Sequence, residues 1–572
     1  MLQNVRVAGS IYDEVHAWKY RGAGENHREA CNRQAAALQD SKDHFNKYRW
    51  ALINDLYLPG GRIQSSVGST RITTAYNCFV SGTIEDSFVD GYGCIMDRAK
   101  EAAATMRLGG GIGYDFSPLR PFGSLIAKVQ SHTGGPIPFM GIFDSTCYCV
   151  SSAGHRRGAQ MGVLRVDHPD IERFIHCKQD GHSLTRFNIS VALTHKFMEC
   201  LKNNTPFPLV FQNRTFSEIN PASLWDMLMR STWDWAEPGC LFIDTINDWN
   251  NLWWLEWIAA TNPCGEQPLP PFGACLLGSF NLVNLLTHTG SKFEFDWETF
   301  KGIIPHVVRS MDNVIDRTVY PLHAQEKEAK SKRRMGLGVT GLANCLEALG
   351  HPYGSDGFLD IEAQILETLR NDTYRTSVEL AKEKGAFTLF DKDKYAQGKF
   401  IQTLPEDLQG MIFDNGIRNS HLTSIAPTGT ISFASGNVSS GIEPPYGYEY
   451  ERDVETMEGE KTYKLTDFNY REFGLKGKTI LTGDITIDDH LNVLATAQKF
   501  IDSAVSKTCN IPKGYDWEDF KNVYWRAYEM GCKGCTTYRE DGKRRGILNE
   551  TEKETEAVAC YIDPVTGRKE CE

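Results

Sequence analysis

The stretch Thr261-Asn262-Pro263-Cys264-Gly265-Glu266-Gln267-Pro268 places an amide, a thiol and a carboxylate at alternating positions. Its two prolines lack a backbone donor and oppose a helix, so the stretch is expected to run extended or as a loop. In an extended chain alternate side chains point the same way, which predicts that Asn262, Cys264 and Glu266 converge on one small ligand. An amide, a reactive sulfur and a general base indicate a catalytic site. Taken alone, the stretch also fits a proline-rich turn around a structural cysteine.

The composition is that of an ordinary globular protein. The chain has 572 residues, 41% hydrophobic and 23% charged, which is enough for several domains or one large barrel. A net charge of -12 gives no basic field that favours nucleic acid. We find neither a long apolar run that predicts a membrane span nor the apolar core of a secretory signal. The 16 scattered cysteines favour a reducing compartment, so we predict a cytoplasmic protein without nucleic-acid or membrane partners.

Helical and strand-like segments alternate along the chain, which predicts an α/β architecture. Residues 424–450 read as strands and loops, and the polar stretch 549–572 reads as a flexible tail. The principal helices are expected at 25–58, 90–106, 296–322, 341–349, 360–384, 490–505 and 516–530.

Three glycine-rich segments are candidate phosphate loops. In residues 426–432 (Ala-Pro-Thr-Gly-Thr-Ile-Ser), free amides and hydroxyls can cradle an anion. Residues 109–113 and 156–162 are the other two. Glycine clusters are usually plain turns, and none of the three has the spacing of a P-loop.

The cysteines fall into several groups. Cys264 and Cys275 frame a proline-rich loop, and Cys78 lies in an apolar, strand-like context. Cys532 and Cys535 form a Cys-x-x-Cys pair, which fits redox work, half of a zinc site or plain structure; no second pair completes a metal site, so no metal is expected. Burial cannot explain the tail residues Cys560 and Cys571, which favours thiol exchange. Core filling is expected for Cys31, Cys94, Cys147, Cys149, Cys177, Cys200, Cys240, Cys345 and Cys509.

Residues Asn262 to Glu266, followed by Gly273 to Ser279, closely resemble the finger loop of ribonucleotide reductase catalytic subunits. The resemblance covers most of the chain. Its further segments are Pro59 to Arg62, Asn77 to Val80, Gly109 to Pro121, Gly158 to Ile171, Met335 to Leu342, Ala426 to Ser432, Gly441 to Pro445 and Gly531 to Arg539.

The resemblance implies a barrel of ten strands, built from two parallel five-stranded halves joined antiparallel, with the finger loop through its centre. It divides the chain into a short helical region at 1–60 without an ATP-binding cone domain, a barrel at 61–548, and a cysteine-containing tail at 549–572.

The resemblance also implies roles for five residues. Cys264 would carry the thiyl radical that abstracts the 3′ hydrogen of the ribose. Glu266 would take the 3′-hydroxyl proton as general base, and Asn262 would hold the substrate. Cys78 and Cys275 would be the dithiol that reduces the 2′ carbon and ends as a disulfide, because replacing a hydroxyl by hydrogen needs two electrons.

Substrate and effector sites are implied in the same way. A deoxynucleotide effector would contact Asp86, Ser87 and Arg157, and the loop of Arg157 would pass its identity to the substrate site. We further expect a thioredoxin- or glutaredoxin-like reductant, with Cys560 and Cys571 as electron shuttle, and a homodimer. The ribonucleotide, as di- or triphosphate, would be bound by Asn77, Thr428, Gly429, Thr430, Ile431 and Ser432.

The radical source follows from the same resemblance. Relatives that receive a radical from a metal-containing subunit carry a Tyr-Tyr pair where this chain has only Tyr538, and no glycyl-radical motif (Arg-Val-x-Gly-Tyr) occurs. The segments Gly531 to Cys535 and Arg156 to Met161 resemble the adenosylcobalamin-dependent class, so we predict this cofactor. The alternatives are a catalytic subunit that needs a separate radical-generating protein, a non-catalytic nucleotide-binding regulator, and a thiol-redox or zinc module.

Overall fold

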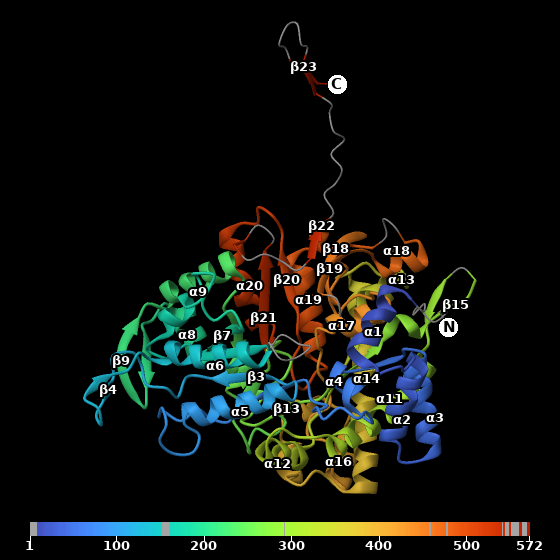
Figure 1. Cartoon of the computed structure of the whole chain (residues 1–572), viewed down its shortest axis with the longest axis horizontal. Helices are drawn as coiled ribbons and strands as arrows, with labels where there is room; N and C mark the ends of the chain where they lie inside the picture. Colours follow the sequence, from blue (N-terminus) through green and yellow to red (C-terminus); the bar gives the residue numbers. More distant parts are fainter. Residues whose placement is uncertain are drawn as a thin grey trace.

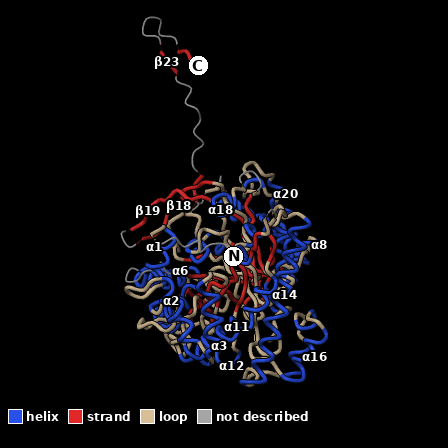
Figure 2. The backbone as a smooth tube through the Cα atoms, turned by 90° about the vertical axis from the view of Figure 1, so that its right-hand side faces the viewer, coloured by secondary structure: helices blue, strands red, loops and turns tan. Residues whose placement is uncertain are grey.

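A computed structural model gives the fold. Many of the strands occupy the interior of the molecule with helices around them, and a few hairpins lie at its periphery (Figures 1 and 2). The structure describes residues 9–151, 159–290, 292–456, 459–475, 479–539, 542–543, 548–550, 560–562 and 569–571.

Five strands pair in parallel, in the order in which they follow one another along the chain. Most of their residues are buried and apolar, as in Phe187–Leu193, because a parallel sheet is covered on both faces. The strands are β2 (Cys78–Val80), β3 (Gly111–Asp115), β6 (Gln160–Arg165), β7 (Phe187–Leu193) and β10 (Gly239–Phe242).

A second group of parallel pairings comes from the later part of the chain. β14 (Leu277–Asn281) pairs with β17 (Gly336–Thr340), and β20 (Thr508–Ile511) pairs with β21 (Gly534–Arg539). Isolated parallel bridges join Leu337 to Thr423 and Ile425 to Val505, and so lie between these two pairs. β1 (Tyr57–Pro59) borders β14.

The two groups meet through antiparallel pairings. β21 pairs antiparallel with β10, and β13 (Ala274–Cys275), which leads directly into β14, pairs antiparallel with β2. The predicted mixed α/β fold is confirmed. Strands outside these groups are β4 (Leu125–Ile126), β5 (Ser131–His132), β8 (Phe207–Phe211), β9 (Arg214–Ile219), β11 (Ala260–Thr261), β12 (Pro268–Leu269), β15 (Leu286–His288), β16 (Phe293–Phe295), β18 (Glu449–Thr456), β19 (Gly459–Thr466), β22 (Leu548–Glu550), β23 (Cys560–Ile562) and β24 (Lys569–Cys571).

Long helices cover the strands, largely where the sequence predicts them. In α14 (Asp356–Lys384) the Ser355 side chain caps the first turn, and Gly385 ends the helix with φ 84°. Other helices are α5 (Ile95–Arg107), α6 (Pro136–Ser151), α7 (Ile171–His176), α8 (His195–Asn203), α9 (Pro221–Trp235), α10 (Ile243–Asp248), α11 (Trp297–Arg317), α12 (His323–Lys332), α13 (Leu342–Ala348), α15 (Lys392–Ala396), α16 (Glu406–Asn415), α18 (Phe468–Phe473), α19 (Ile487–Gln498) and α20 (Trp517–Glu529).

The chain begins with α1 (Ile11–Tyr20), α2 (His27–Leu38), α3 (Lys42–Ile53) and, after β1, α4 (Gly61–Ser66). α2 and α3 pack on each other and on α11, beside α14 (Figure 1). No helix in the described parts of the chain has both the length and the apolar character that crossing a bilayer requires.

The apolar side chains form a large core between strands and helices and a separate inner cluster. The inner cluster gathers Cys78 of β2, Cys275 of β13, Leu241 of β10, Leu277 of β14 and Ala426. Because its members come from both groups of strands, the inner cluster lies where the two groups face each other.

Candidate active site

Residues 260–269 form a short hairpin that we call the finger hairpin. Its strands β11 (Ala260–Thr261) and β12 (Pro268–Leu269) pair antiparallel, and the Asn262 N–H donates to the Gln267 carbonyl at 3.2 Å. The loop between the strands carries the reactive stretch. The predicted absence of a helix in this stretch is confirmed by the hairpin.

The three candidate side chains of the loop are not aligned by strand alternation. Gly265 has φ 83°, and its N–H donates to the Asn262 carbonyl at 3.1 Å, which closes a turn. Asn262 and Glu266 are buried, at 0% and 2% exposure, whereas Cys264 is exposed. The expected convergence through an extended chain is therefore wrong. The turn at Gly265 sets the three positions instead.

Neighbouring strands hold the finger hairpin on both sides of its cysteine. Asn188 on β7 donates from Nδ2 to the Pro263 carbonyl at 3.0 Å. The Glu266 carbonyl accepts from Ser424 Oγ at 2.9 Å and from the Ala504 N–H at 3.0 Å. These bonds fix the backbone on either side of the thiol, which gives the thiol a rigid support.

The glycines of β3 let the finger hairpin approach the sheet. A Cβ atom at Gly113 would lie 1.8 Å from the Thr261 carbonyl oxygen. A Cβ at Gly111 would lie 3.3 Å from Pro263 Cγ and 3.2 Å from Cys78 Sγ. The second glycine-rich segment therefore leads into a strand, β3, against which the hairpin packs, and its glycines allow this close approach.

Cys78 and Cys275 face each other across the pairing of β2 with β13. Opposite residues of an antiparallel pair have Cβ atoms about 4.5–5.5 Å apart, and a disulfide joins Cα atoms about 4.4–6.8 Å apart. Both side chains are buried and present as thiols. The contact of Gly111 with both Cys78 and Pro263 places this thiol pair beside the finger hairpin.

The predicted phosphate segment is the start of a short helix, α17 (Gly429–Ala434), and not the strand or loop expected there. Thr428 precedes the helix with φ 49°. Its Oγ1 accepts from the Gly441 N–H at 2.8 Å and contacts Thr340 Oγ1 at 2.9 Å. The first N–H groups of a helix have no intrahelical acceptor and suit an anion. Thr430, Ile431 and Ser432 lie in this first turn.

The predicted substrate residue Asn77 directly precedes β2. Its Oδ1 accepts from the Arg62 N–H at 3.4 Å, and its N–H donates to the Cys275 carbonyl at 3.2 Å. The Asn77 backbone therefore lies beside the thiol pair.

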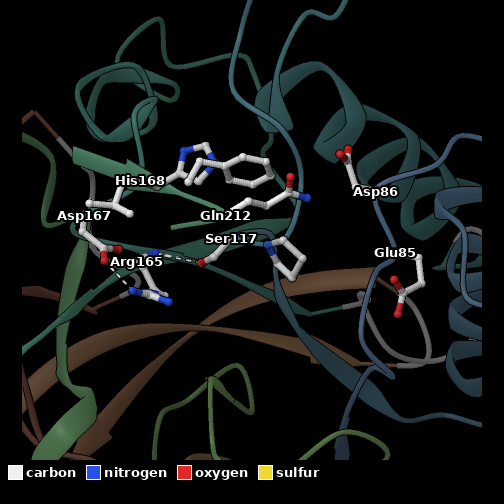
Figure 3. A pocket seen from close by; sticks show the side chains of 10 residues that line it. Glu85, Asp86, Ser117, Arg165, Asp167, His168 and Gln212 are labelled. Atoms are coloured by element: carbon white, nitrogen blue, oxygen red, sulfur yellow. Dashed lines mark hydrogen bonds and ion pairs between the residues drawn. The ribbon is translucent and has the colours of Figure 1, made fainter. Parts of the chain in front are cut away.

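The predicted effector residue Asp86 borders a cavity of about 270 Å³. Its carboxylate accepts from Arg120, from the backbone N–H at 3.1 Å and from Nε at 2.7 Å. Figure 3 shows Glu85 and Asp86 on one side of the cavity. The cavity shares no residue with the finger hairpin, and its remaining lining consists of Ser117, Pro118, Arg165, Asp167, His168, Val210, Phe211 and Gln212.

The predicted effector residue Ser87 accepts a hydrogen bond from the Asp90 N–H at 3.1 Å through its hydroxyl, which stabilises a turn. The third predicted effector residue, Arg157, lies outside the described residues. Cys560 and Cys571 occupy opposite positions of the antiparallel pair β23–β24.

The remaining cysteines divide between core and surface. Cys532 and Cys535 are buried, but Cys149 is exposed, so the expectation that it fills the core is wrong. Cys177 and Cys200 are half-buried. Within the described ranges, no three His, Cys, Asp or Glu side chains gather in a way that could hold a metal ion.

The finger hairpin is supported by Asn188, Ser424 and Ala504, and the sequence analysis predicts a role for none of the three. All three bonds end on backbone carbonyls of the finger hairpin, and all three join segments that are far apart in the chain. No local motif signals such contacts.

Comparison with known proteins identifies the family of this chain. The family described as "Ribonucleotide reductase, barrel domain" matches residues 76–538. The chain belongs to the ribonucleotide reductases, as the resemblance of its finger loop predicts.

The similar relatives carry a more particular name. A vitamin B12-dependent ribonucleoside-diphosphate reductase of Mycobacterium tuberculosis is 32% identical, over 90% of this chain and 76% of that protein. The enzyme of the same name from Thermoplasma acidophilum is 32% identical, over 90% of this chain and 67% of that protein. A vitamin B12-dependent ribonucleotide reductase of Streptomyces avermitilis is 26% identical, over 94% of this chain and 63% of that protein.

Proposed function

We propose that this chain reduces ribonucleotides to 2′-deoxyribonucleotides through a thiyl radical whose source is adenosylcobalamin. The observation that carries the proposal is the position of the thiol pair Cys78 and Cys275 beside a hairpin that presents Cys264. The vitamin B12-dependent relatives support the choice of cofactor.

The proposed roles follow the chemistry of each group. Cys264 takes the 3′ hydrogen, Glu266 accepts the proton of the 3′ hydroxyl, and Asn262 holds the substrate by hydrogen bonds. The 2′ hydroxyl leaves as water, and Cys78 and Cys275 supply the two electrons as they close a disulfide. Burial supports these roles, because Asn262 and Glu266 are shielded from bulk water.

Asn262 has a further feature that suits substrate binding. Its Oδ1 accepts from the Gln267 N–H at 3.0 Å, whereas its buried Nδ2 has no partner among the described residues. A buried donor without an acceptor is costly, and a ribose hydroxyl would satisfy it. The amide of Asn262 is thus oriented by the hairpin and available to a ligand.

The phosphates of the substrate are proposed to bind at the first turn of α17. The strand-like segment that ends at Ala426 leads into this helix, and Ala426 belongs to the inner cluster together with Cys78 and Cys275. The helix therefore begins beside the inner cluster, and the N–H groups of Thr428 to Ser432 suit an anion.

The proposed place of the cofactor is the side of β21 that faces away from α20. Cys535 and Thr537 are buried, and Thr537 Oγ1 bonds to Tyr524 of α20 at 3.0 Å, whereas Thr536 between them is exposed. Thr536 therefore faces away from α20. We propose that the exposed Thr536 and Cys264 border the cofactor, which supplies a radical when bound. The residues of the chain orient the substrate and move its protons.

The strand pairings support the ten-stranded barrel. One half is the five parallel strands from β2 to β10, and the other is β14, β17, the segment 423–425, the segment 505–511 and β21. The antiparallel pairs β10–β21 and β2–β13 join the halves at both ends. We propose that these contacts close the barrel around the finger hairpin.

Regulation and assembly complete the proposal. We propose that a deoxynucleotide effector binds near Asp86 and Ser87, beside the cavity described above, and that Arg157 passes its identity to the substrate site. Large apolar side chains on and near α5 and α6 remain exposed, which favours a homodimer through this face. They are Phe88, Val89, Tyr92, Met96 and Tyr148.

A thioredoxin- or glutaredoxin-like reductant is proposed to regenerate the thiol pair through the tail. Cys560 and Cys571 occupy opposite positions of the β23–β24 pair, which supports the proposal that they act together as a dithiol. Replacing both by serine should keep turnover with dithiothreitol and abolish it with a protein reductant. Full turnover with the protein reductant would contradict this role.

The test of the proposed function is reduction of CDP and CTP by the purified chain with dithiothreitol and a deoxynucleotide effector, with and without adenosylcobalamin. Deoxynucleotide formed only with the cofactor is the expected result. Product formed without it, or only after a second protein is added, would overturn the proposed radical source.

A further inference from the structure

Lys533, the residue between the two cysteines of the Cys-x-x-Cys segment, is buried at 4% exposure. Its Nζ donates to the carbonyls of Asp502 and Ser503, at 2.6 Å each. Burial lowers the pKa of the Lys533 amine to about 8. Burying an amine is costly unless its donors are satisfied, so these two bonds define the place of the side chain.

The two carbonyls belong to a turn that touches the finger hairpin. The next residue, Ala504, donates its N–H to the Glu266 carbonyl at 3.0 Å. The Asp502 carboxylate accepts from the backbone N–H groups of Leu422 and Thr423, at 2.6 and 3.1 Å. The turn 502–504 thereby connects the finger hairpin to the strand-like segment that carries Ser424.

We infer that Lys533 is a positioning residue for the active site: by fixing the turn 502–504 it fixes the Glu266 carbonyl, and with it the loop that presents Cys264. The catalytic meaning of this inference rests on the proposed function. The mechanical link from Lys533 to the loop does not, because it consists of hydrogen bonds between described residues.

The cysteines of the segment have a different environment. Cys535 Sγ lies 3.9 Å from Cys509 Sγ, and Thr537, two residues further on, bonds to α20 on the side of the strand away from the inner cluster. Cys532 is wholly buried in the main core. The residue of the Cys-x-x-Cys segment that is linked to the finger hairpin, through the turn 502–504, is therefore its lysine.

The first experiment compares Lys533→Met with Lys507→Met by hydrogen exchange and mass spectrometry. Lys507 is an equally buried lysine, but its Nζ bonds to Glu443, His490 Nδ1 and the Thr508 carbonyl, at 2.6, 2.9 and 2.7 Å, none of them in the hairpin. In Lys533→Met we expect the amides of residues 262–267 to exchange roughly tenfold faster, the effect of losing about one hydrogen bond. Exchange in α11 should stay at the wild-type level.

Lys507→Met is expected to leave exchange in residues 262–267 unchanged. An unchanged hairpin in Lys533→Met, or the same acceleration in both variants, would overturn the inference. The reactivity of Cys264 gives a second readout: iodoacetamide should modify it at an altered rate in Lys533→Met only. Neither measurement needs turnover, so failure of the proposed function would not be mistaken for failure of the positioning role.

A milder variant covers the case in which Lys533→Met does not fold. Ser424→Ala removes the other donor to the Glu266 carbonyl and deletes only a hydroxyl. Faster exchange in residues 262–267 of this variant is expected, and an unchanged rate would overturn the idea that the carbonyl holds the loop. In active enzyme, both variants should lower kcat more than they raise KM.

Discussion

Cys78 and Cys275 lie opposite each other in the antiparallel pair β2–β13, at positions from which two thiols can close a disulfide. The pair belongs to the inner cluster and not to the main core. Its place beside the finger hairpin suits a role as electron donor to a ligand held there.

The first prediction concerns this thiol pair. One turnover without external reductant should remove two thiols from the wild-type chain and link the peptides of Cys78 and Cys275, as seen by peptide mapping. Cys275→Ser should form no such link and make no deoxynucleotide beyond background. Cys345→Ala, in the main core on α13, should behave as wild type. Repeated turnover by Cys275→Ser would contradict the role.

The second prediction tests the general base. Glu266→Gln keeps the backbone carbonyl that Ser424 and Ala504 hold, so the loop should stay in place. Without a proton acceptor, kcat should fall by about 10²–10⁴-fold. Steady-state kinetics with saturating substrate measures this change. The exposed Glu298→Gln on α11 is the matched control and should retain full activity, and near-normal kcat in Glu266→Gln would rule out the assignment.

The third prediction concerns the close approach at Gly113. A methyl group there would overlap the Thr261 carbonyl oxygen, 1.8 Å from its Cβ, so the finger hairpin must move. Gly113→Ala should lower the free energy of unfolding by about 1–3 kcal/mol or more and abolish activity. Gly302→Ala, in an exposed part of α11 with open space around it, should instead gain about 0.5–1 kcal/mol. Urea unfolding separates the two, and equal stability of both variants would contradict the packing argument.

The sequence predicts features that local rules determine. The long helices α11 and α14 lie within a few residues of their predicted ranges, because amphipathic spacing and polar caps mark them. The two prolines around Cys264 correctly predict a loop. The six-residue helix α17 was missed, since one and a half turns carry no periodicity.

The features that the sequence does not predict depend on long-range contacts and on the local backbone turn. Strand alternation gave the wrong reason for the grouping of Asn262, Cys264 and Glu266, because a positive φ at Gly265 turns the loop. Lys533 bonds to carbonyls some 30 residues away in the sequence. Backbone acceptors carry no sequence signature, so this link becomes visible only in three dimensions.

The last prediction is a pH dependence of stability at Glu347 of α13. This buried carboxyl accepts from the Ile480 N–H at 3.0 Å, and burial raises its pKa from 4.5 to about 8. Between pH 4.5 and about 8 the folded state keeps a proton that the unfolded chain has released. The free energy of unfolding therefore falls as pH rises through this window. The slope of the free energy of unfolding from this group is about 1.4 kcal/mol per pH unit.

Glu347→Gln removes that proton equilibrium but keeps an acceptor for Ile480. Relative to wild type, the variant should become steadily more stable between pH 5 and pH 8, the window set by the raised pKa. Urea unfolding of both proteins at each pH gives the difference directly, and other titrating groups cancel because they are common to both. A difference that stays constant across this window would show that the Glu347 carboxyl is ionised in the folded protein.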